Sequence, residues 1–392
     1  MYESLKKSFR EYFNCGAEFI FSAPGRTELS GNHTDHQLGR VLAGAVSVDT
    51  VAAVSATDDG MIHVVSEGYP PCHIHLNDLS VNTAQFGTTP ALIRGVAAGI
   101  SARGHQVRGF NAYIRSEVLS GSGLSSSAAF EVLIGTILNH LCGCGLTAVE
   151  IAQIGQYAEN VYFGKPCGLM DQMASSVGNI VAIDFADREN PNVEPIDFDF
   201  SKCGYALCII NSGADHADLT DEYAAIPAEL KAVCGVFGKN HLREVSEEEF
   251  YARICEVRAV AGDRATLRAI HVFEENRRVD AQTKALREGD FETFLRLNAQ
   301  SGRSSWMYLQ NVIPAGNKAH QELAFTLALA EKLLDGRGAC RVHGGGFAGT
   351  IQAFVPMENL ENFRTEIENV LGSGSCQVLS IRSQGGILVE EV

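Results

Sequence analysis

One stretch of this chain, residues 125–141, is apolar on nearly every side. Its apolar residues include Leu133, Ile134, Ile137, Leu138 and Leu141. A helix at the surface keeps a polar face, whereas a helix that is apolar all round is buried against other structure. Residues 125–141 therefore predict a helix buried against a sheet.

Short runs of alternating or β-branched residues predict the strands of that sheet. They are residues 50–54, 62–65, 110–114, 180–184 and 207–211. We interpret residues 191–195, which begin and end with proline, as a polar interruption between strands. From residue 247 to residue 300 the chain is charged and helical, and a glycine-rich turn with a strand follows at 342–355. This change of pattern predicts an α+β protein of two domains, residues 1–205 and 206–392.

The composition is that of a globular protein with an excess of acidic residues. Of its 392 residues, 47 are Asp or Glu and 31 are Lys or Arg, which gives a formal net charge of −16. Such a charge repels nucleic acids and anionic membrane surfaces, so we expect neither as a partner. A small anionic ligand is still compatible with it, because backbone amides bind anions locally.

The cysteines and the apolar segments indicate a cytoplasmic protein. The 11 cysteines are an odd number without zinc-binding spacing, as expected for reduced thiols. The most apolar stretch, residues 41–56, falls short of the ~20 uninterrupted apolar residues of a membrane span. Residues 1–14 have the spacing of an amphipathic helix and lack the pattern of a secretory leader. We therefore expect a soluble, cytoplasmic chain.

The segment with the clearest chemistry lies between a predicted strand and the apolar helix. Its glycines let backbone amides approach an anion, its serines add donors, and the start of the helix adds positive potential. It lacks the lysine of a Walker A loop and the third glycine of a dinucleotide fingerprint. Two interpretations stay open, a phosphate-binding loop and a serine-rich turn that caps a helix. The residues are Gly121, Ser122, Gly123, Leu124, Ser125, Ser126 and Ser127.

A second polar segment, residues 23–36, contains groups suited to a sugar. Asn32, His33 and Asp35 supply donors and acceptors for hydroxyls, and Arg26 supplies a fixed cation. A metal site formed by His33, Asp35 and His36 is a competing interpretation, although a distant fourth ligand is lacking. A solvated loop is the third interpretation.

Three further features carry less information alone. Asp171 is predicted in the first turn of a helix, where an aspartate is either a cap or a base. Burial would raise the pKa of such a carboxyl and the helix dipole would lower it. Glu159, on the preceding helix, is either a ligand for Mg²⁺ or a surface residue. The glycine-rich turn at residues 343–349 indicates close backbone approach, to a ligand or to a packed neighbour.

In this order, the segments resemble the GHMP small-molecule kinases and, within them, the galactokinase family. The opening pattern of that family, Pro-Gly-Arg-Val-Asn-Leu-Ile-Gly-Glu-His-Thr-Asp-Tyr, is similar to residues 24–36. Its phosphate loop is similar to residues 121–129, and its closing glycine-rich motif to residues 344–349. The resemblance implies a two-domain GHMP kinase fold with the active site in the cleft between the domains.

The resemblance also implies roles for single residues. Asp171 would be the catalytic base or the electrostatic partner of the attacking hydroxyl, with Arg26 beside it. Ser127 and Glu159 would hold Mg²⁺, and residues 121–127 would bind the phosphates of ATP. The implied sugar-binding residues are Asn32, His33, Asp35, Gly168 and Tyr223. The implied reaction is phosphorylation of the anomeric hydroxyl of galactose by ATP, in a monomer or a weak homo-oligomer.

The chain departs from the family pattern on the sugar side. Thr27 and Glu28 replace Val-Asn, Asn32 replaces the sugar-binding Glu, and His36 replaces Tyr. His343 replaces the usual Thr of the closing motif. The neutral Asn32 could admit a substituted or acidic sugar, so a kinase for N-acetylgalactosamine or galacturonate is an alternative. A non-catalytic regulator that binds sugar and ATP is the other, although the intact phosphate loop with Arg26 and Asp171 argues against it.

Overall fold

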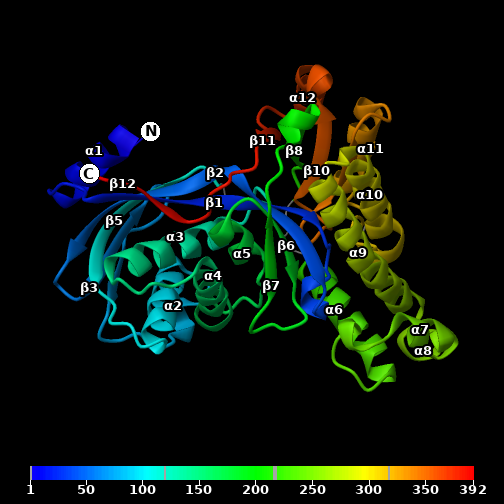
Figure 1. Ribbon diagram of the computed structural model, residues 1–392, viewed down its shortest axis with the longest axis horizontal. Coiled ribbons are helices and arrows are strands. Elements are labelled where there is room, and N and C mark those ends of the chain that lie inside the picture. Colours follow the sequence, from blue (N-terminus) through cyan, green and yellow to red (C-terminus); the bar gives the residue numbers. More distant parts are fainter. Residues whose placement is uncertain (1, 119–120, 215–218, 317) are drawn as a thin grey trace.

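A computed structural model describes residues 2–118, 121–214, 219–316 and 318–392, and these form two lobes side by side (Figure 1). The first five helices lie in one lobe and the other seven in the second. The helices are α1 (Tyr2–Phe13), α2 (Thr89–Ala102), α3 (Ser126–Leu141), α4 (Ala148–Tyr157), α5 (Met170–Val177), α6 (Thr220–Val236), α7 (Glu247–Ala252), α8 (Ile254–Ala261), α9 (Asp263–Glu288), α10 (Phe291–Ser304), α11 (Glu322–Leu334) and α12 (Leu360–Leu371).

The first lobe is built on an eight-stranded sheet that is antiparallel except for one parallel pair, β3 with β5. The first half of β2 pairs with β6 and its second half with β5. In order, the strands are β12 (Ile387–Glu391), β1 (Phe19–Ser30), β2 (Arg40–Thr57), β5 (Gly109–Ser116), β3 (Met61–Ser66) and β4 (Cys72–His75), with β6 (Ile180–Asp184) beside β2 and β7 (Asn192–Ile196) beside β6.

The predicted strands at 50–54, 62–65, 110–114 and 180–184 all lie within this sheet, which confirms them. The interpretation of residues 191–195 as an interruption is wrong, because β7 covers most of them. Among the described strands, β7 pairs with β6 alone and is therefore an edge strand. An edge strand tolerates a residue without an amide hydrogen, such as Pro195.

The buried helix predicted at 125–141 is α3, which begins at Ser126. It lies with α2, α4 and α5 on one face of the first sheet (Figure 1). Leu133, Ile134 and Leu138 are 0% exposed, which confirms the prediction. α1 packs on the opposite face through Leu5 and Phe9.

The second lobe is built on a four-stranded antiparallel sheet. α11 and α12 pack on one face of it, and α9 and α10 contact the other. The predicted strand at 207–211 belongs here, and the segment at 342–355, predicted as a glycine-rich turn with a strand, forms the end of one strand, a turn and most of the next strand. In order, the strands are β11 (Cys376–Leu379), β8 (Tyr205–Asn211), β10 (Thr350–Pro356) and β9 (Ala339–His343).

One apolar cluster joins the two lobes. It contains Leu29 and Leu42 of the first sheet, Leu207 and Phe354 of the second, and Phe294 of α10. We propose a division of the chain near residue 205, where β8 begins, with β12 returning to the first sheet. Through this cluster the two lobes are packed against each other.

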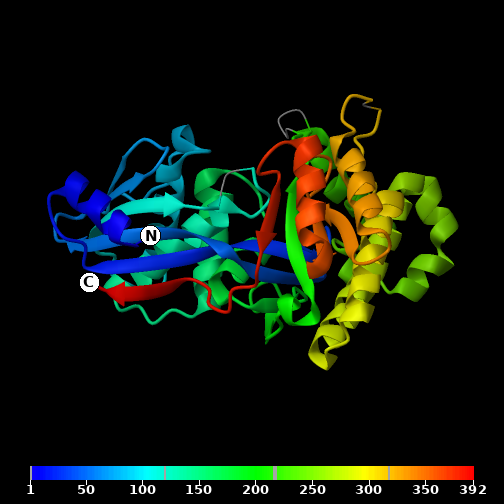
Figure 2. The same cartoon turned by 90° about the horizontal axis from the view of Figure 1, so that it is seen from above.

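The described ends of the chain meet on the first lobe. β12 lies beside β1, close to α1 (Figure 2). Lys6 of α1 and Glu390 of β12 form an ion pair of 2.7 Å. The strand that closes this edge of the sheet therefore comes from the far end of the sequence.

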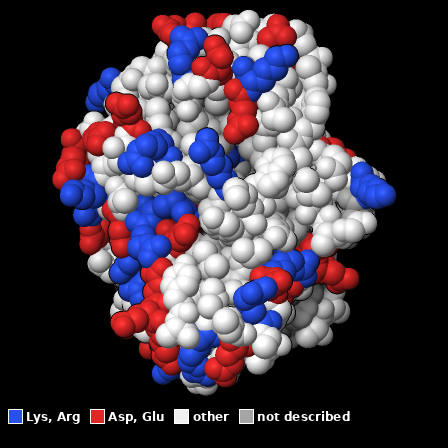
Figure 3. Space-filling view, turned by 90° about the vertical axis from the view of Figure 1, so that its right-hand side faces the viewer, with Lys and Arg blue, Asp and Glu red and all other residues white. Residues whose placement is uncertain are grey.

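The surface carries both signs of charge. On the face seen in Figure 3, acidic and basic side chains lie next to one another. Arg277 pairs with Glu247, and Arg258 pairs with Asp263 at 2.7 Å. No helix among the described residues combines the length and the apolar character that crossing a membrane requires.

Candidate active site

Segments far apart in the sequence converge between the two lobes around two adjoining cavities. The first, which we call the strand cavity, has a volume of about 330 Å³ and is lined mainly by β1, the turn that follows it, and residues 165–171. The second, the loop cavity, has a volume of about 450 Å³ and is lined by the loop before α3 and the turn after β9. Both cavities are lined by Arg26, Lys165, Asp171, Gly344 and Gly345.

Asp171 and Arg26 stand where the two cavities meet. The Arg26 guanidinium donates to Asp171 through Nε at 2.6 Å and Nη2 at 2.8 Å, and through Nη1 to the Gly123 carbonyl at 2.5 Å. The Ser125 hydroxyl also donates to Asp171. Burial alone would raise the pKa of Asp171, but Arg26 and the Ser125 hydrogen bond lower it below its ordinary value. Asp171 is therefore an ionised carboxylate held in a fixed orientation.

The loop before α3 has a backbone that few sequences could adopt. Gly121, Gly123 and Ser125 have φ values of 79°, 75° and 57°, in the left-handed region. A Cβ on Gly123 would lie 2.3 Å from the Thr350 hydroxyl, so the loop is pressed against β10. Ser125 is the N-cap residue of α3, yet its side chain binds Asp171 and caps no helix amide. The start of α3 is thus left open toward the loop cavity, as an anion site requires.

Glu159 lies on the other side of the loop cavity and is buried, with 3% exposure. It belongs to a π-helical segment, Ala158–Phe163, that continues α4. Its Oε1 accepts from the Ser127 hydroxyl and from Lys165 Nζ, each at 3.2 Å, and its Oε2 accepts from Gln172 Nε2 at 2.9 Å. The surface interpretation of Glu159 is wrong, because the side chain is enclosed by these partners.

Ser127 and Glu159 offer hard oxygen atoms, which suit Mg²⁺. Across the described part of the chain, no three His, Cys, Asp or Glu side chains converge so that they could hold a metal ion. A cation beside Ser127 and Glu159 would therefore take its other ligands from water and from a bound anion, as Mg²⁺ commonly does.

Asp35 and Gly168 face each other in the strand cavity. A Cβ on Gly168 would lie 1.8 Å from Asp35 Oδ2, so only glycine fits at position 168. Burial raises the pKa of Asp35 to about 6, against a backbone hydrogen bond from His36 that lowers it. Asp35 is a carboxylate with room for a further donor, such as a ligand hydroxyl.

His33 and His36 form a directed chain of hydrogen bonds. The Leu242 amide donates to Gln37 Oε1 at 3.0 Å, so Gln37 Nε2 is the donor to His36 Nδ1 at 3.1 Å. His36 Nε2 then donates to His33 Nδ1 at 3.3 Å, and His33 Nε2 donates to the Gly345 carbonyl at 3.0 Å. Burial lowers the pKa of both rings, that of His36 to about 3. The interpretation of His33, Asp35 and His36 as a metal site is wrong, because the rings bind each other.

The other predicted sugar-binding residues are Asn32 and Tyr223. Asn32 lines the strand cavity but is 0% exposed, with its amide bonded to neighbouring residues. The Tyr223 hydroxyl donates to the Gly346 carbonyl, and its ring covers Gly345. Tyr223 lines a third cavity of about 490 Å³, which adjoins the strand cavity through His33, Asp35 and Gly168.

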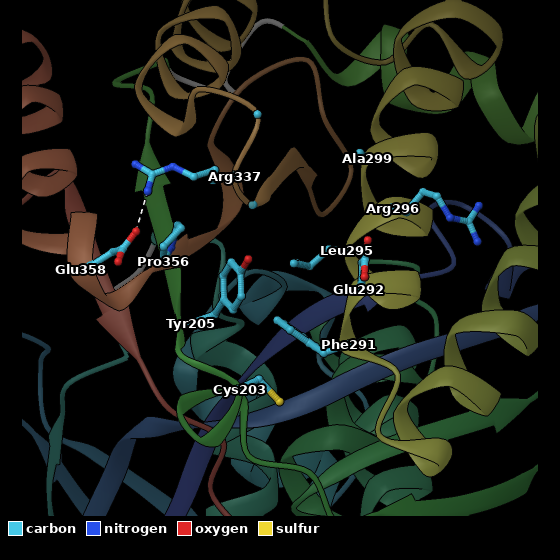
Figure 4. A pocket seen from close by; sticks show the side chains of 12 residues that line it. Cys203, Tyr205, Phe291, Glu292, Leu295, Arg296, Ala299, Arg337, Pro356 and Glu358 are labelled. Atoms are coloured by element: carbon cyan, nitrogen blue, oxygen red, sulfur yellow. Dashed lines mark hydrogen bonds and ion pairs between the residues drawn. The ribbon is translucent and has the colours of Figure 1, made fainter.

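A cavity outside the cleft has a volume of about 590 Å³ and lies between α10 and the second sheet (Figure 4). Tyr205, Phe291 and Leu295 line it, and Arg337 and Glu358 are paired with each other there. None of the predicted site residues borders it. The candidate catalytic and binding residues therefore lie in the cleft and not around this cavity.

Several residues of the cleft were not predicted from the sequence. Lys165 pairs with Glu159, and Glu28 lines the strand cavity. Glu131 of α3 accepts from Gln172 Nε2 at 2.9 Å, and burial raises its pKa well above the ordinary value. A signal existed for Glu28 and Glu131, since a charged residue inside a buried strand or an apolar helix needs a partner. For Lys165, in a loop, no such signal exists.

Comparison with known proteins places this site among sugar and small-molecule kinases. The family model for the GHMP kinases N terminal domain matches residues 91–179, and that for the galactokinase galactose-binding signature matches residues 7–56. Galactokinase of Mannheimia succiniciproducens is 32% identical over 363 residues, covering 92% of this chain and 91% of that protein. Galactokinase of Streptomyces coelicolor is 30% identical, with 94% and 93% covered.

Solved structures of two kinases also match this chain over most of its length. The crystal structure of Lactococcus lactis galactokinase complexed with galactose superposes with a TM-score of 0.83 at 25% identity, covering 98% of this chain and 99% of that one. The mevalonate kinase of Methanococcus jannaschii shares the fold, with a TM-score of 0.66 at 16% identity over 94% of this chain and 99% of its own. The predicted α+β GHMP kinase fold is thereby confirmed.

Proposed function

The chain belongs to the galactokinase family of GHMP kinases and is a sugar kinase, and we propose that it transfers the γ-phosphoryl group of ATP to the anomeric hydroxyl of galactose. One observation carries the proposal. The Arg26–Asp171 pair stands between a cavity rich in sugar-binding groups and a cavity built from an anion-binding loop. A transfer reaction needs its two substrates on either side of such a pair.

We assign the sugar to the strand cavity and the ATP phosphates to the loop cavity. The left-handed backbone at residues 121–125 and the open start of α3 would hold the phosphates. Lys165 and Arg26, which line both cavities, would neutralise charge on the transferred group. Asp35 would accept a hydrogen bond from a sugar hydroxyl, which would fix the ring against Gly168.

Asp171 orients the attacking hydroxyl. As the anomeric oxygen bonds to the γ-phosphorus, the bond from phosphorus to the bridging oxygen breaks and ADP leaves. The hydroxyl proton passes to Asp171 only late in the transfer, because the lowered pKa of that carboxylate makes it a weak base. The main contribution of Asp171 is then alignment and electrostatic stabilisation of the hydroxyl.

We propose that Mg²⁺ binds between Ser127, Glu159 and the phosphates of ATP. When bound, it would neutralise phosphate charge. The 3.2 Å hydrogen bond from the Ser127 hydroxyl to Glu159 supports this assignment, because it places the two oxygen atoms side by side at the wall of the loop cavity. We further propose a cytoplasmic location and a monomeric or weakly oligomeric state, in keeping with the reduced cysteines.

The test is a transfer assay with the purified protein, ATP and Mg²⁺. Galactose, N-acetylgalactosamine and galacturonate are offered separately, and each product is identified by mass. We expect galactose to gain one phosphoryl group with stoichiometric formation of ADP. Transfer to another sugar but not to galactose would contradict the assigned substrate. Transfer to none would favour a regulator that binds sugar and ATP.

A further inference from the structure

On β1 and the turn that follows it, the two largest departures from the family pattern lie at residues 28 and 32. Together they exchange the positions of a glutamate and an asparagine. The family carries Asn at the position of Glu28 and Glu at the position of Asn32, whereas this chain carries the same two residue types in the opposite order. In the structure the two side chains touch, since Asn32 Nδ2 donates to Glu28 Oε1 at 3.1 Å. The carboxylate therefore stands at residue 28 in this chain and at the position of residue 32 in the family pattern, within one pair of hydrogen-bonded side chains.

The exchange has a buried counter-ion. Glu28 is 4% exposed, and Arg341 of β9, which is 0% exposed, donates to its Oε1. Arg341 also donates to the Leu29 carbonyl at 2.9 Å, which fixes the guanidinium behind β1. A buried carboxylate requires a positive partner of this kind. The negative charge at position 28 is thus accommodated by the fold.

Asn32 and His33 have their polar atoms engaged within the protein. Asn32 Nδ2 also donates to the Gly344 carbonyl at 2.6 Å, and Asn32 Oδ1 accepts from Asn311 Nδ2 at 2.8 Å. Both ring nitrogens of His33 are bonded, to His36 and to Gly345. Neither side chain presents a free oxygen or nitrogen to a sugar.

Glu28 is different. Both hydrogen bonds of its carboxylate use Oε1, and Oε2 makes none with the described residues. Glu28 lines the strand cavity together with Asp35 and Asp171. Its charge acts inside that cavity, because it contributes to the raised pKa of Asp35. An unpartnered carboxylate oxygen at a cavity wall calls for a ligand that donates a hydrogen bond.

We propose that Glu28 is a substrate-binding residue that determines specificity, and that it selects neutral sugars whose hydroxyls donate to its Oε2 while repelling uronic acids. The proposal rests on the proposed function. It also bears on the alternative substrates, because the neutral Asn32 suggests that an acidic sugar would be tolerated. Glu28 restores the negative charge that Asn32 lacks, so galacturonate would meet a carboxylate in the strand cavity.

The test compares galactose with galacturonate in the wild type and in Glu28→Gln, which keeps the shape of the side chain and removes its charge. We measure kcat/KM for each sugar at saturating ATP. The wild type is expected to prefer galactose, and the variant should lower the ratio of galactose to galacturonate about tenfold or more, since like charges in contact cost several kcal/mol. The loss for galactose should appear in KM, while kcat changes little.

Two further variants separate recognition from folding. Glu229→Gln is the matched control, because Glu229 also pairs with a fully buried arginine, Arg268, but lines neither cavity of the cleft. It should leave the sugar ratio unchanged. The exchange variant Glu28→Asn/Asn32→Glu returns the family order and keeps one carboxylate in the pair, so it should fold and prefer galactose. It takes the place of Glu28→Gln if that variant does not fold.

The outcomes distinguish the two proposals. If the wild type phosphorylates galactose and a folded Glu28→Gln keeps the wild-type ratio, the role of Glu28 is refuted and the proposed function stands. A folded exchange variant without preference for galactose would refute that role in the same way. If the wild type phosphorylates galacturonate and not galactose, both proposals are wrong.

Discussion

The two cavities of the cleft are built in different ways. The loop cavity is shaped by backbone: Gly121, Gly123 and Ser125 hold left-handed conformations, and the start of α3 is open toward it. The strand cavity is shaped by side chains whose partners lie on distant elements, such as Glu28 on Arg341 and Asn32 on Asn311. A site formed by the backbone depends on a short local sequence. In a site formed by side chains, a substitution at one residue requires a matching substitution at its bonded partner. The family departures at residues 28, 32 and 36 line the strand cavity, whereas the departure at His343 lines the loop cavity.

The largest effect is expected at Asp171, which serves both cavities. Asp171→Asn should lower kcat about 10³-fold, because it removes the charge that pairs with Arg26 and aligns the hydroxyl. The measurement is steady-state ADP formation with galactose. Galactose binding serves as the control and should stay near the wild-type value, whereas the unfolding temperature should fall, because the buried Arg26 loses its charged partner. A variant with near-normal kcat would show that Asp171 is not the residue on which the function of both cavities depends.

The next effect separates the cavities. Gly168→Ala places a methyl group on Asp35, and overpacking of about 1–3 kcal/mol should raise the KM for galactose roughly 10- to 100-fold while leaving the KM for ATP unchanged. Gly235→Ala is the control, because Gly235 lies within α6 and a Cβ there would meet no atom within 4 Å. Equal increases in both KM values would mean that the two cavities are not independent.

A smaller effect is expected from pH. Since the pKa of Asp35 is about 6, kcat/KM for galactose should fall about fivefold between pH 6 and pH 5 as Asp35 gains a proton, and the KM for ATP should stay unchanged. Asp35→Asn should abolish this dependence and weaken sugar binding.

The same group affects stability. A folded-state pKa above the ordinary value of 3.8 means that Asp35 contributes stability while protonated and that this contribution is lost as pH rises through about 6. Asp35→Asn should therefore unfold at a higher temperature than the wild type at pH 7. A lower unfolding temperature would contradict the raised pKa.

The smallest effect is expected on the loop-cavity side. Ser127→Ala should raise the Mg²⁺ concentration for half-maximal activity about fivefold, because a water molecule can replace one hydroxyl ligand at a cost of about 1 kcal/mol. The KM for galactose should not change. An altered KM for galactose with an unaltered Mg²⁺ requirement would indicate that Ser127 binds the sugar and not Mg²⁺.

The elements that position the site were largely predictable. The buried helix α3, the turn at the start of α5 and the loop at 121–127 follow from periodicity and glycine placement, which act over a few residues. Long-range partners could not be predicted. No local pattern shows that Glu28 meets Arg341, or that the rings of His33 and His36 bind each other, because these contacts depend on how the lobes pack. For that reason the substitutions at residues 28 and 32 could be identified from the sequence, but not the hydrogen bond that joins their side chains.

The edge strand β12 has a consequence for how the molecule folds. Along this edge β12 pairs with residues 19–22 of β1, so these residues stay unpaired there until residues 387–391 have been synthesised. An open edge offers its amides and carbonyls to any other extended chain. A copy that lacks residues 387–391 would therefore leave this edge of β1 open, and we expect it to aggregate more readily than the chain that carries them.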